Sequence, residues 1–335
     1  MKVTGINTTT TIQTCNLTKY YGKNRGIENL NLTVKKGEIF GFLGPNGAGK
    51  TTTIRLLLDL IRKTSGEATI FGYNTQKDSE KIREHVAYIP GELGFYKDWT
   101  GRRTLQYLFK LYNHNVKWTV VEELAQTFKL DLDKKIRELS KGNKQKIGAV
   151  SALAPDVDLL ILDEPTSGLD PLIKNEFYKA LAKKHTESGC TIFLSSHVLE
   201  EVEKVAHRVS IIRQGFLVEV ADLSQLKRLA LKHIEVSLAS PADIKTLREK
   251  LPKQLAENFT AEGSRVSLLA NREDLRSLLS LLQDLGFRDL NISDSTLEDV
   301  FLEYYNSKPN GKALGGKQEN ETAANLRKSK WRWLF

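Results

Sequence analysis

The segment GPNGAGKT, Gly44 to Thr51, has residue types and a spacing that suit a polyphosphate ligand. It lies between a short apolar run and a helical pattern, where glycines let backbone N–H groups face phosphate oxygens and the helix dipole adds attraction. Lys50 is predicted to contact the β- and γ-phosphates and the Thr51 hydroxyl to bind Mg²⁺. The simpler alternative is a glycine-rich turn that only opens a helix. The predicted nucleotide-binding residues of this segment are Gly44, Pro45, Asn46, Gly47, Ala48, Gly49, Lys50, Thr51 and Thr52.

Two adjacent acids follow the apolar run LLIL further along the chain. Asp163 stands at the carboxyl end of a predicted strand, which is a usual position for a second Mg²⁺ ligand beside such a loop. Glu164 lies one residue further and is predicted to polarise an attacking water as a general base. The alternative is that both acids only end a strand. His197 follows the run FLSS and is predicted to face the γ-phosphate, although a lone histidine is more often a satisfied core or surface residue. Lys50, Glu164 and His197 are the predicted catalytic residues.

A second segment, LSKGNKQKIGAV, also has the character of an anion-binding turn. It places a serine and a glycine among lysines, directly before an apolar helical run, and a helix N-terminus favours negative charge. Ser140 and Gly142 are therefore predicted to contact a phosphate. Because the chain already has one complete phosphate-binding loop, this second turn raises the question of whose phosphate it contacts.

The elements that must position these residues follow an α/β pattern. From residue 12 to about residue 220, short β-rich runs alternate with amphipathic helical segments. GEIFGFLG and DLLILDEP are predicted strands, and GKTTTIRLLLDLI is a predicted helix. Residues 93–154 are mostly helical in pattern, which predicts a helical subdomain inserted in the sheet domain.

Residues 221–306 show a βαββαβ-like order that predicts a small α+β accessory domain, with TLEDVFLEYY as its last helix. Residues 1–11 are expected to form a flexible leader. Residues 307–335, rich in glycine and charge, are expected to form a basic flexible tail. The tail ends in NLRKSKWRWLF, whose cations and aromatics suit an anionic membrane surface. The alternative is a disordered end with incidental aromatics.

The net charge of +9 is unevenly distributed. From Ser307 onward seven Lys/Arg stand against two Asp/Glu, so this segment carries +5 and the rest of the chain +4. The nearly balanced charge of the residues before Ser307 does not support nucleic-acid binding, and no nucleic-acid partner is expected. The chain is 40% hydrophobic and 27% charged and has no apolar run of membrane-spanning length. With only Cys15 and Cys190, a reduced cytosolic protein is expected.

The order of these motifs resembles the nucleotide-binding domain of an ATP-binding cassette (ABC) transporter. The loop Gly44–Thr51, then LSKGNKQ, then LLILDEPTSGLD and then His197 carry the resemblance, which covers roughly residues 12–220. It implies a P-loop NTPase fold, ATP and Mg²⁺ as ligands, and hydrolysis of ATP to ADP and phosphate.

The resemblance also implies two further contacts. An aromatic residue should stack on adenine, and Tyr21 has the matching place, with the adjacent Tyr20 as the alternative. The segment SGLD matches the family's D-loop at the dimer contact, which makes Asp170 a predicted nucleotide-site residue.

Two positions depart from the family pattern. Gly91 stands where a glutamine normally senses Mg²⁺ and the membrane subunit, so that role passes to Glu92, to water, or is absent. The segment LSKGNKQ matches the family's signature motif, in which Lys141 replaces the first glycine. The Lys141 side chain either adds charge toward phosphate or points to solvent. Both departures, with NKQK and the carboxyl-terminal unit, resemble the exporter branch that includes bacitracin-resistance and other drug, toxin or ion efflux ATPases.

In this family two nucleotide-binding domains close head-to-tail over two ATP molecules and drive a polytopic membrane permease. The chain has one P-loop and one signature, so a homodimer is the simpler expectation and a heterodimer the alternative. The resemblance implies a separate permease chain and a peripheral location on the cytoplasmic face of the plasma (inner) membrane. Phe95, Tyr96 and Trp99 are predicted either to receive a permease helix or to pack the helical subdomain.

The leading hypothesis is therefore an ATP-hydrolysing motor subunit of an ABC export system. One alternative is a soluble ABC ATPase that acts on nucleic acid or the ribosome, but such proteins typically carry two cassettes or long insertions, which are not visible in this sequence. The other is a cassette that binds ATP as a regulatory subunit. Intact Lys50, Asp163, Glu164 and His197 argue against this second alternative.

Overall fold

The computed structural model divides the chain into two compact units, with the boundary between Leu223 and Ser224. None of the helices in the described part of the chain has the length and apolar composition of a membrane-spanning segment. The structure describes residues 9–112, 116–223, 232–252, 255, 259–270 and 274–294.

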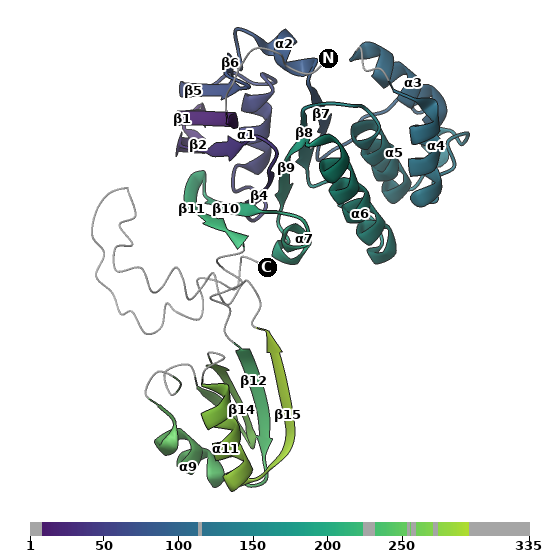
Figure 1. Cartoon of the computed structure of the whole chain (residues 1–335). Helices are drawn as coiled ribbons and strands as arrows, with labels where there is room; N and C mark the ends of the chain where they lie inside the picture. The colour runs from purple at the N-terminus through teal and green to yellow at the C-terminus, as the bar shows by residue number, and fades with distance from the viewer. Residues whose placement is uncertain are drawn as a thin grey trace. The chain divides into compact units, whose positions relative to one another are not determined.

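The first unit is built around a six-stranded, mainly parallel sheet (Figure 1). Only the edge strand β11 runs antiparallel to its neighbour. The central strands of this sheet are buried along their whole length, as is typical of parallel strands that are covered on both faces. In spatial order the strands are β11 (Phe216–Asp222), β10 (Arg208–Arg213), β4 (Ile39–Leu43), β9 (Thr191–Ser196), β8 (Leu159–Asp163) and β7 (Val86–Ile89).

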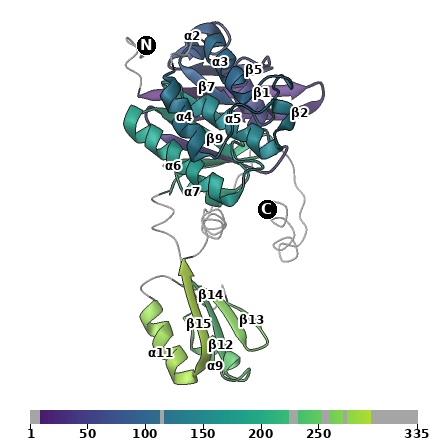
Figure 2. The ribbon, with the colours of Figure 1, turned by 90° about the vertical axis from the view of Figure 1, so that its right-hand side faces the viewer.

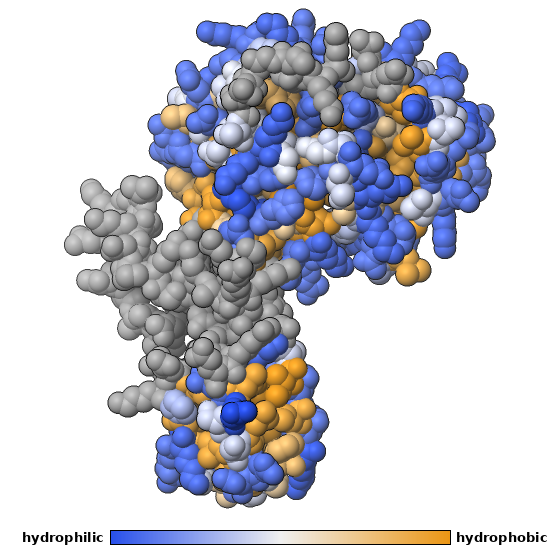
Figure 3. All heavy atoms as spheres, viewed as in Figure 1, coloured by the Kyte–Doolittle hydropathy of each residue, from blue (hydrophilic) through white to orange (hydrophobic). Residues whose placement is uncertain are grey.

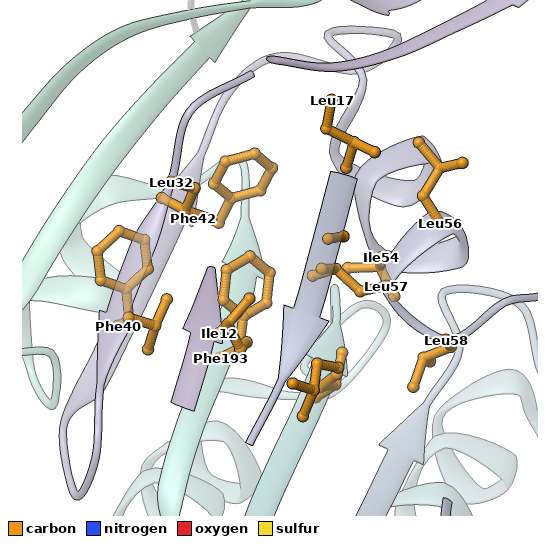
Figure 4. Packing of buried hydrophobic residues seen from close by; sticks show 14 of the residues in the cluster. Ile12, Leu17, Leu32, Phe40, Phe42, Ile54, Leu56, Leu57, Leu58 and Phe193 are labelled. Carbon is orange, nitrogen blue, oxygen red and sulfur yellow. The ribbon is translucent and has the colours of Figure 1, made fainter. Parts of the chain in front are cut away.

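A second, antiparallel sheet packs against the first through a shared apolar core. Its strands are β2 (Asn24–Leu30), β1 (Thr10–Tyr21), β5 (Ser65–Ile70) and β6 (Tyr73–Asn74), with β3 (Thr33–Lys35) paired to β1. Figure 4 shows Ile12 of β1 beside Phe40, Phe42 and Phe193 of the parallel sheet. The predicted leader boundary at residue 11 is too late, because Thr11 is buried within β1 and its hydroxyl lies 3.1 Å from that of Thr191.

Four helices connect the strands of this unit: α1 (Lys50–Leu57), α2 (Ser79–Arg83), α6 (Pro171–Ser188) and α7 (Leu199–Glu203). The first of them is shorter than its sequence pattern predicts. It ends at Leu57 because Asp59 adopts a left-handed φ of 56° and the Leu60 N–H bonds back to the Arg55 carbonyl at 2.8 Å.

The helices predicted for residues 93–154 form a compact group beside the parallel sheet, at the right of Figure 1. They are α3 (Gly101–Leu111), α4 (Trp118–Thr127), a 3₁₀ turn (Ile136–Glu138) and α5 (Lys141–Leu153). Thr100 caps α3 by accepting a hydrogen bond from Arg103 N, and Ser140 caps α5 in the same way. The group thus presents the N-terminus of α5, which carries the predicted signature turn, at its surface.

The second unit has the βαββαβ order predicted from the sequence. Two helices cover one face of an antiparallel sheet with the strand order β13-β14-β12-β15 (Figure 2). In the view of Figure 3, apolar residues gather on the coloured surface of this unit. The predicted helix TLEDVFLEYY and the tail 307–335 lie outside the described residues. The elements are β12 (Lys232–Leu238), α9 (Asp243–Lys250), β13 (Thr260–Glu262), β14 (Arg265–Ala270), α11 (Leu275–Leu285) and β15 (Phe287–Asp294).

Candidate functional site

The phosphate-binding segment forms the loop between β4 and α1. The Gly44 N–H bonds to the Ser196 carbonyl at 3.2 Å, which ties the loop to the end of β9. Gly49, directly before α1, has a left-handed φ of 112°. A Cβ at this position would lie 2.7 Å from Ile27 Cγ2 and 2.8 Å from the Gly26 carbonyl oxygen, so only glycine fits. The loop therefore has the tight backbone that its glycine spacing predicts.

Lys50 lies inside this loop rather than in solvent. Its side chain is only 5% exposed, and Nζ donates to the carbonyl oxygens of Gly44 at 2.5 Å and Pro45 at 3.1 Å. The ammonium also lies 3.1 Å from Oε1 of Glu164. The loop carbonyls and one carboxylate thus hold a buried cation at the point where a phosphate is predicted to bind.

Asp163 ends β8 and is fully buried. Its two carboxylate oxygens accept hydrogen bonds from different elements: Oδ2 from Thr51 Oγ1 at 2.7 Å and Oδ1 from Ser195 Oγ at 2.6 Å. The sequence reasoning missed Ser195. Ser195 pairs directly with Asp163 in the parallel register of β8 and β9, and the spacing of the two residues along the chain does not reveal this register.

Glu164 and His197 meet beside Lys50. His197 Nδ1 lies 2.6 Å from Glu164 Oε2. Glu164 has a left-handed φ of 49°, and its N–H bonds to both Ser195 Oγ and the Ser195 carbonyl at 3.2 Å. Such strain in a non-glycine residue persists only where surrounding contacts fix it. The Lys50 contact lacks hydrogen-bond geometry, so Oε1 accepts no hydrogen bond among the described residues.

Thr51 and Asp163 together fit a Mg²⁺ ion that is also bound by a nucleotide. Their hydroxyl and carboxylate oxygens converge within 2.7 Å, and Mg²⁺ prefers oxygen ligands, usually one or two carboxylates plus phosphates. The described residues contain no cluster of three His, Cys, Asp or Glu side chains that would hold a metal without the nucleotide. Gly91 faces the same carboxylate, because a Cβ there would lie 3.4 Å from Asp163 Oδ2. A side chain at position 91 would therefore reach this site.

Tyr21, rather than Tyr20, lies next to the helix that begins at the P-loop. A Cβ at Gly26 would lie 2.9 Å from the Tyr21 ring and 3.1 Å from the Thr52 methyl group, so these groups surround one point. Tyr21 is 46% exposed and therefore has an open ring surface. Tyr20 is instead engaged with Glu28, and a hydrogen bond to that carboxylate raises the pKa of the Tyr20 hydroxyl.

The signature turn contacts the predicted D-loop of the same chain. A Cβ at Gly142 would lie 2.8 Å from the Gly168 carbonyl oxygen, which explains the glycine. A Cβ at Gly168 would lie 3.8–3.9 Å from the side-chain carbons of Lys141. The Lys141 side chain is exposed but packs on the D-loop. Asp170 caps α6 through a 3.1 Å hydrogen bond from Ile173 N. The sequence reasoning did not identify Gly168 as the residue against which the signature packs.

A phosphate-binding loop after β4, two adjacent acids where β8 ends and a helical subdomain with its own anion-facing turn define an ATP-binding cassette. The family model for ABC transporters matches residues 27–167. The chain is 39% identical over 297 residues to the bacitracin transport ATP-binding protein BcrA of Bacillus licheniformis, covering 88% of this chain and 96% of that protein. The chain belongs to the family of ABC transporter ATP-binding proteins.

Solved structures agree with this assignment. The structure of an ATP-binding subunit of an ABC transporter matches with a TM-score of 0.59 and 28% identity, covering 65% of this chain and 92% of that one. A dimeric ATP-binding cassette in a post-hydrolysis state, bound to ADP and Pi, shares the fold with a TM-score of 0.58 and 22% identity over 63% of this chain and 98% of its own. The predicted family and exporter branch are confirmed, and the chain is an ATPase.

Proposed function

We propose that two copies of this chain close around two ATP molecules and drive a separate membrane permease that exports a drug or toxin. The proposal places the chain on the cytoplasmic face of the plasma membrane, bound peripherally. One observation carries it: Figure 1 shows α1, which follows the P-loop, and α5, which follows the signature turn, on opposite sides of β7, β8 and β9. The signature is then available to the ATP of another copy. The similarity to a bacitracin transport protein supports export of this class of compound.

Within each site we propose a role for each side chain. The backbone of residues 44–52 and the Lys50 ammonium bind the phosphates. Thr51 and Asp163 would hold Mg²⁺, which would neutralise charge on the β- and γ-phosphates. Tyr21 stacks on adenine, while Ser140, Gly142 and Asp170 approach the nucleotide held by the partner copy.

The two remaining catalytic groups act on water and on the γ-phosphate. Glu164 accepts a proton from water as the water oxygen attacks the γ-phosphorus and ADP leaves. His197 contacts Glu164 through Nδ1. With a proton on both ring nitrogens, its Nε2 would donate to a γ-phosphate oxygen. Glu164 is thus in contact with both His197 and Lys50.

Mixing two inactive variants tests whether the site is shared between copies. Lys50→Ala removes the P-loop cation, and Ser140→Arg blocks the exposed signature turn of an otherwise intact chain. In mixed dimers the P-loop of the second variant faces the signature of the first, which completes one site. We expect equimolar mixing to restore about one quarter of wild-type ATP turnover, since half of the dimers are mixed and each has one good site. A site formed within one chain would give no recovery.

An exposed aromatic cluster supports the contact with the permease. The rings of Tyr96 and Trp99 lie 4.5 Å apart, Tyr107 lies 5.1 Å from Trp99, and the Arg103 guanidinium lies 4.5 Å from the Trp99 ring. Tyr96 is 61% exposed and Tyr107 is 42% exposed. Exposed aromatics with an arginine are typical of the centre of a protein interface.

Substituting this cluster should uncouple ATP hydrolysis from transport. We expect Tyr96→Ala with Trp99→Ala to lower permease-dependent transport at least about tenfold, the loss expected for two interface anchors. The ATP turnover of the full chain without permease should stay within about twofold of wild type, because no ring or cation contact among the described residues joins the cluster to the P-loop. Tyr73→Ala is the matched control, an aromatic change on β6. Equal losses of transport and of basal turnover would contradict the coupling role.

A further inference from the structure

A buried polar cluster lies directly behind the contact between Glu164 and His197. Its centre is the Glu201 carboxylate on α7, where Oε2 accepts hydrogen bonds from Thr166 Oγ1 at 2.7 Å and Tyr178 OH at 3.0 Å. Lys174 Nζ donates to Oε1 at 2.6 Å. Thr166 lies in the motif LLILDEPTSGLD, but the sequence predicts no role for it or for the other three residues.

The cluster is an ionised group in a mostly dry location. Glu201 is 9% exposed, and Thr166 and Tyr178 are each 4% exposed. Burial by itself raises the pKa of Glu201, but the hydrogen bonds from Lys174, Thr166 and Tyr178 outweigh it and hold the pKa below its ordinary value. A buried carboxylate is tolerated only when it is paired and fully hydrogen-bonded. Its partners must therefore keep a fixed geometry.

The position of this cluster along the chain links it to the site. Thr166 follows Glu164 by two residues, and Glu201 follows His197 by four. The segment after β8 and the segment after β9 are thus joined twice: by Glu164 and His197 at 2.6 Å, and behind them by Thr166 and Glu201 at 2.7 Å. Lys174 and Tyr178 bind the same carboxylate from α6.

We propose that Glu201 is a positioning residue for ATP hydrolysis, which fixes α7 against Thr166 and thereby holds His197 in contact with Glu164. The inference rests on the catalytic roles proposed above for those two residues. His197 is itself 48% exposed, so the buried bond behind it supplies the restraint. Hydrolysis depends on placing such groups to within a fraction of an ångström, whereas nucleotide binding by the P-loop does not require this bond.

Three variants of the full chain remove different parts of the hydrogen-bond network around Glu201, and kcat for ATP hydrolysis is measured for each. Glu201→Ala removes the carboxylate, Thr166→Val removes only the direct link, and Glu201→Gln removes the charge while keeping the shape. We expect Glu201→Ala to lower kcat about tenfold and Thr166→Val about threefold, with KM for ATP within about twofold of wild type. Adding Lys174→Met to Glu201→Gln should restore activity, because it removes the unpaired ammonium.

Glu176→Gln is the matched control, because Glu176 pairs with Lys179 on the same helix α6 but at the surface. Turnover is normalised to the nucleotide-binding sites titrated in each preparation, and thermal unfolding is followed in parallel. A purely structural role would lower the melting temperature and leave kcat per binding site unchanged. That result in both Thr166→Val and Glu201→Gln would overturn the proposal.

The variant His197→Ala shows whether Glu201 acts through His197. In single-turnover measurements, Glu201→Ala should cause less than about a twofold further loss when His197 is already alanine, since two residues of one unit are not additive. A full tenfold further loss would refute the positioning role while leaving the catalytic role of His197 intact. If His197→Ala alone leaves kcat unchanged, the proposed role of His197 fails and this inference falls with it.

Discussion

Replacing Glu164 with glutamine is expected to lower kcat for ATP hydrolysis at least about 100-fold, the range lost when a general base is removed. The amide keeps the shape of the side chain but cannot accept a proton from water. It also weakens the 3.1 Å ion pair with Lys50 and the 2.6 Å contact with His197. ATP binding should persist, because the loop backbone and Lys50 remain. Steady-state phosphate release and equilibrium binding of a fluorescent ATP analogue measure the two quantities separately.

According to the proposed pairing of two copies around ATP, the same variant should also stabilise the ATP-bound pair, because the bound ATP is no longer hydrolysed. Size-exclusion chromatography with light scattering, with Mg²⁺ and ATP, should show a dimer for Glu164→Gln. Glu187→Gln is the control, because Glu187 is a surface residue of α6 that lies 3.9 Å from Lys183. A turnover within tenfold of wild type would exclude Glu164 as the general base.

Lys50→Ala should abolish detectable turnover and weaken ATP binding about tenfold or more, as expected for losing a charge-assisted hydrogen bond to phosphate. In the structure the ammonium contacts the Gly44 and Pro45 carbonyls and the Glu164 carboxylate. Its removal thus leaves a loop without its internal cation and a carboxylate without its partner. Isothermal titration with ATP and a parallel phosphate assay measure both effects.

The control for this prediction is Lys36→Ala, which removes an exposed lysine of the same unit and should change neither quantity by more than about twofold. Lys50→Ala and Glu164→Gln should differ in one respect: the first loses the ATP-dependent dimer and the second accumulates it. Equal ATP affinity in Lys50→Ala and wild type would contradict the assignment of Lys50 to the phosphates.

Much of the fold was predictable because its elements have clear periodicity. The strand before Gly44 and the strand that ends at Asp163 are continuous apolar runs, as buried parallel strands require, and the second unit follows its predicted βαββαβ order. Element ends were less predictable. The apolar pattern after α1 continues past Leu57, but the left-handed turn at Asp59 ends the helix and leaves Leu60 54% exposed.

The site shows the same division. Sequence spacing identified Lys50, Asp163, Glu164 and His197 because each follows a strand or opens a helix at a motif position. It left Tyr20 and Tyr21 as alternatives, since adjacent strand residues differ only in the face they occupy. The contact of Tyr21 with Gly26 beside Thr52 favours Tyr21 as the adenine platform. For Lys141 the sequence spacing left two alternatives: a charge directed toward phosphate, or a side chain that points to solvent. The structure instead packs this side chain on Gly168.

By itself the sequence determined which residues are candidates for the chemistry of this protein: a glycine-rich loop predicted to bind phosphates, an acid predicted to bind Mg²⁺, a predicted general base and a histidine, in a family-specific order. Short motifs can do this because backbone geometry and residue type act locally. Only the tertiary structure brought Ser195 to Asp163 and joined Glu201 to Thr166, Tyr178 and Lys174. These contacts link residues between 23 and 35 positions apart, and strand register and helix packing, not spacing along the chain, decide which side chains meet.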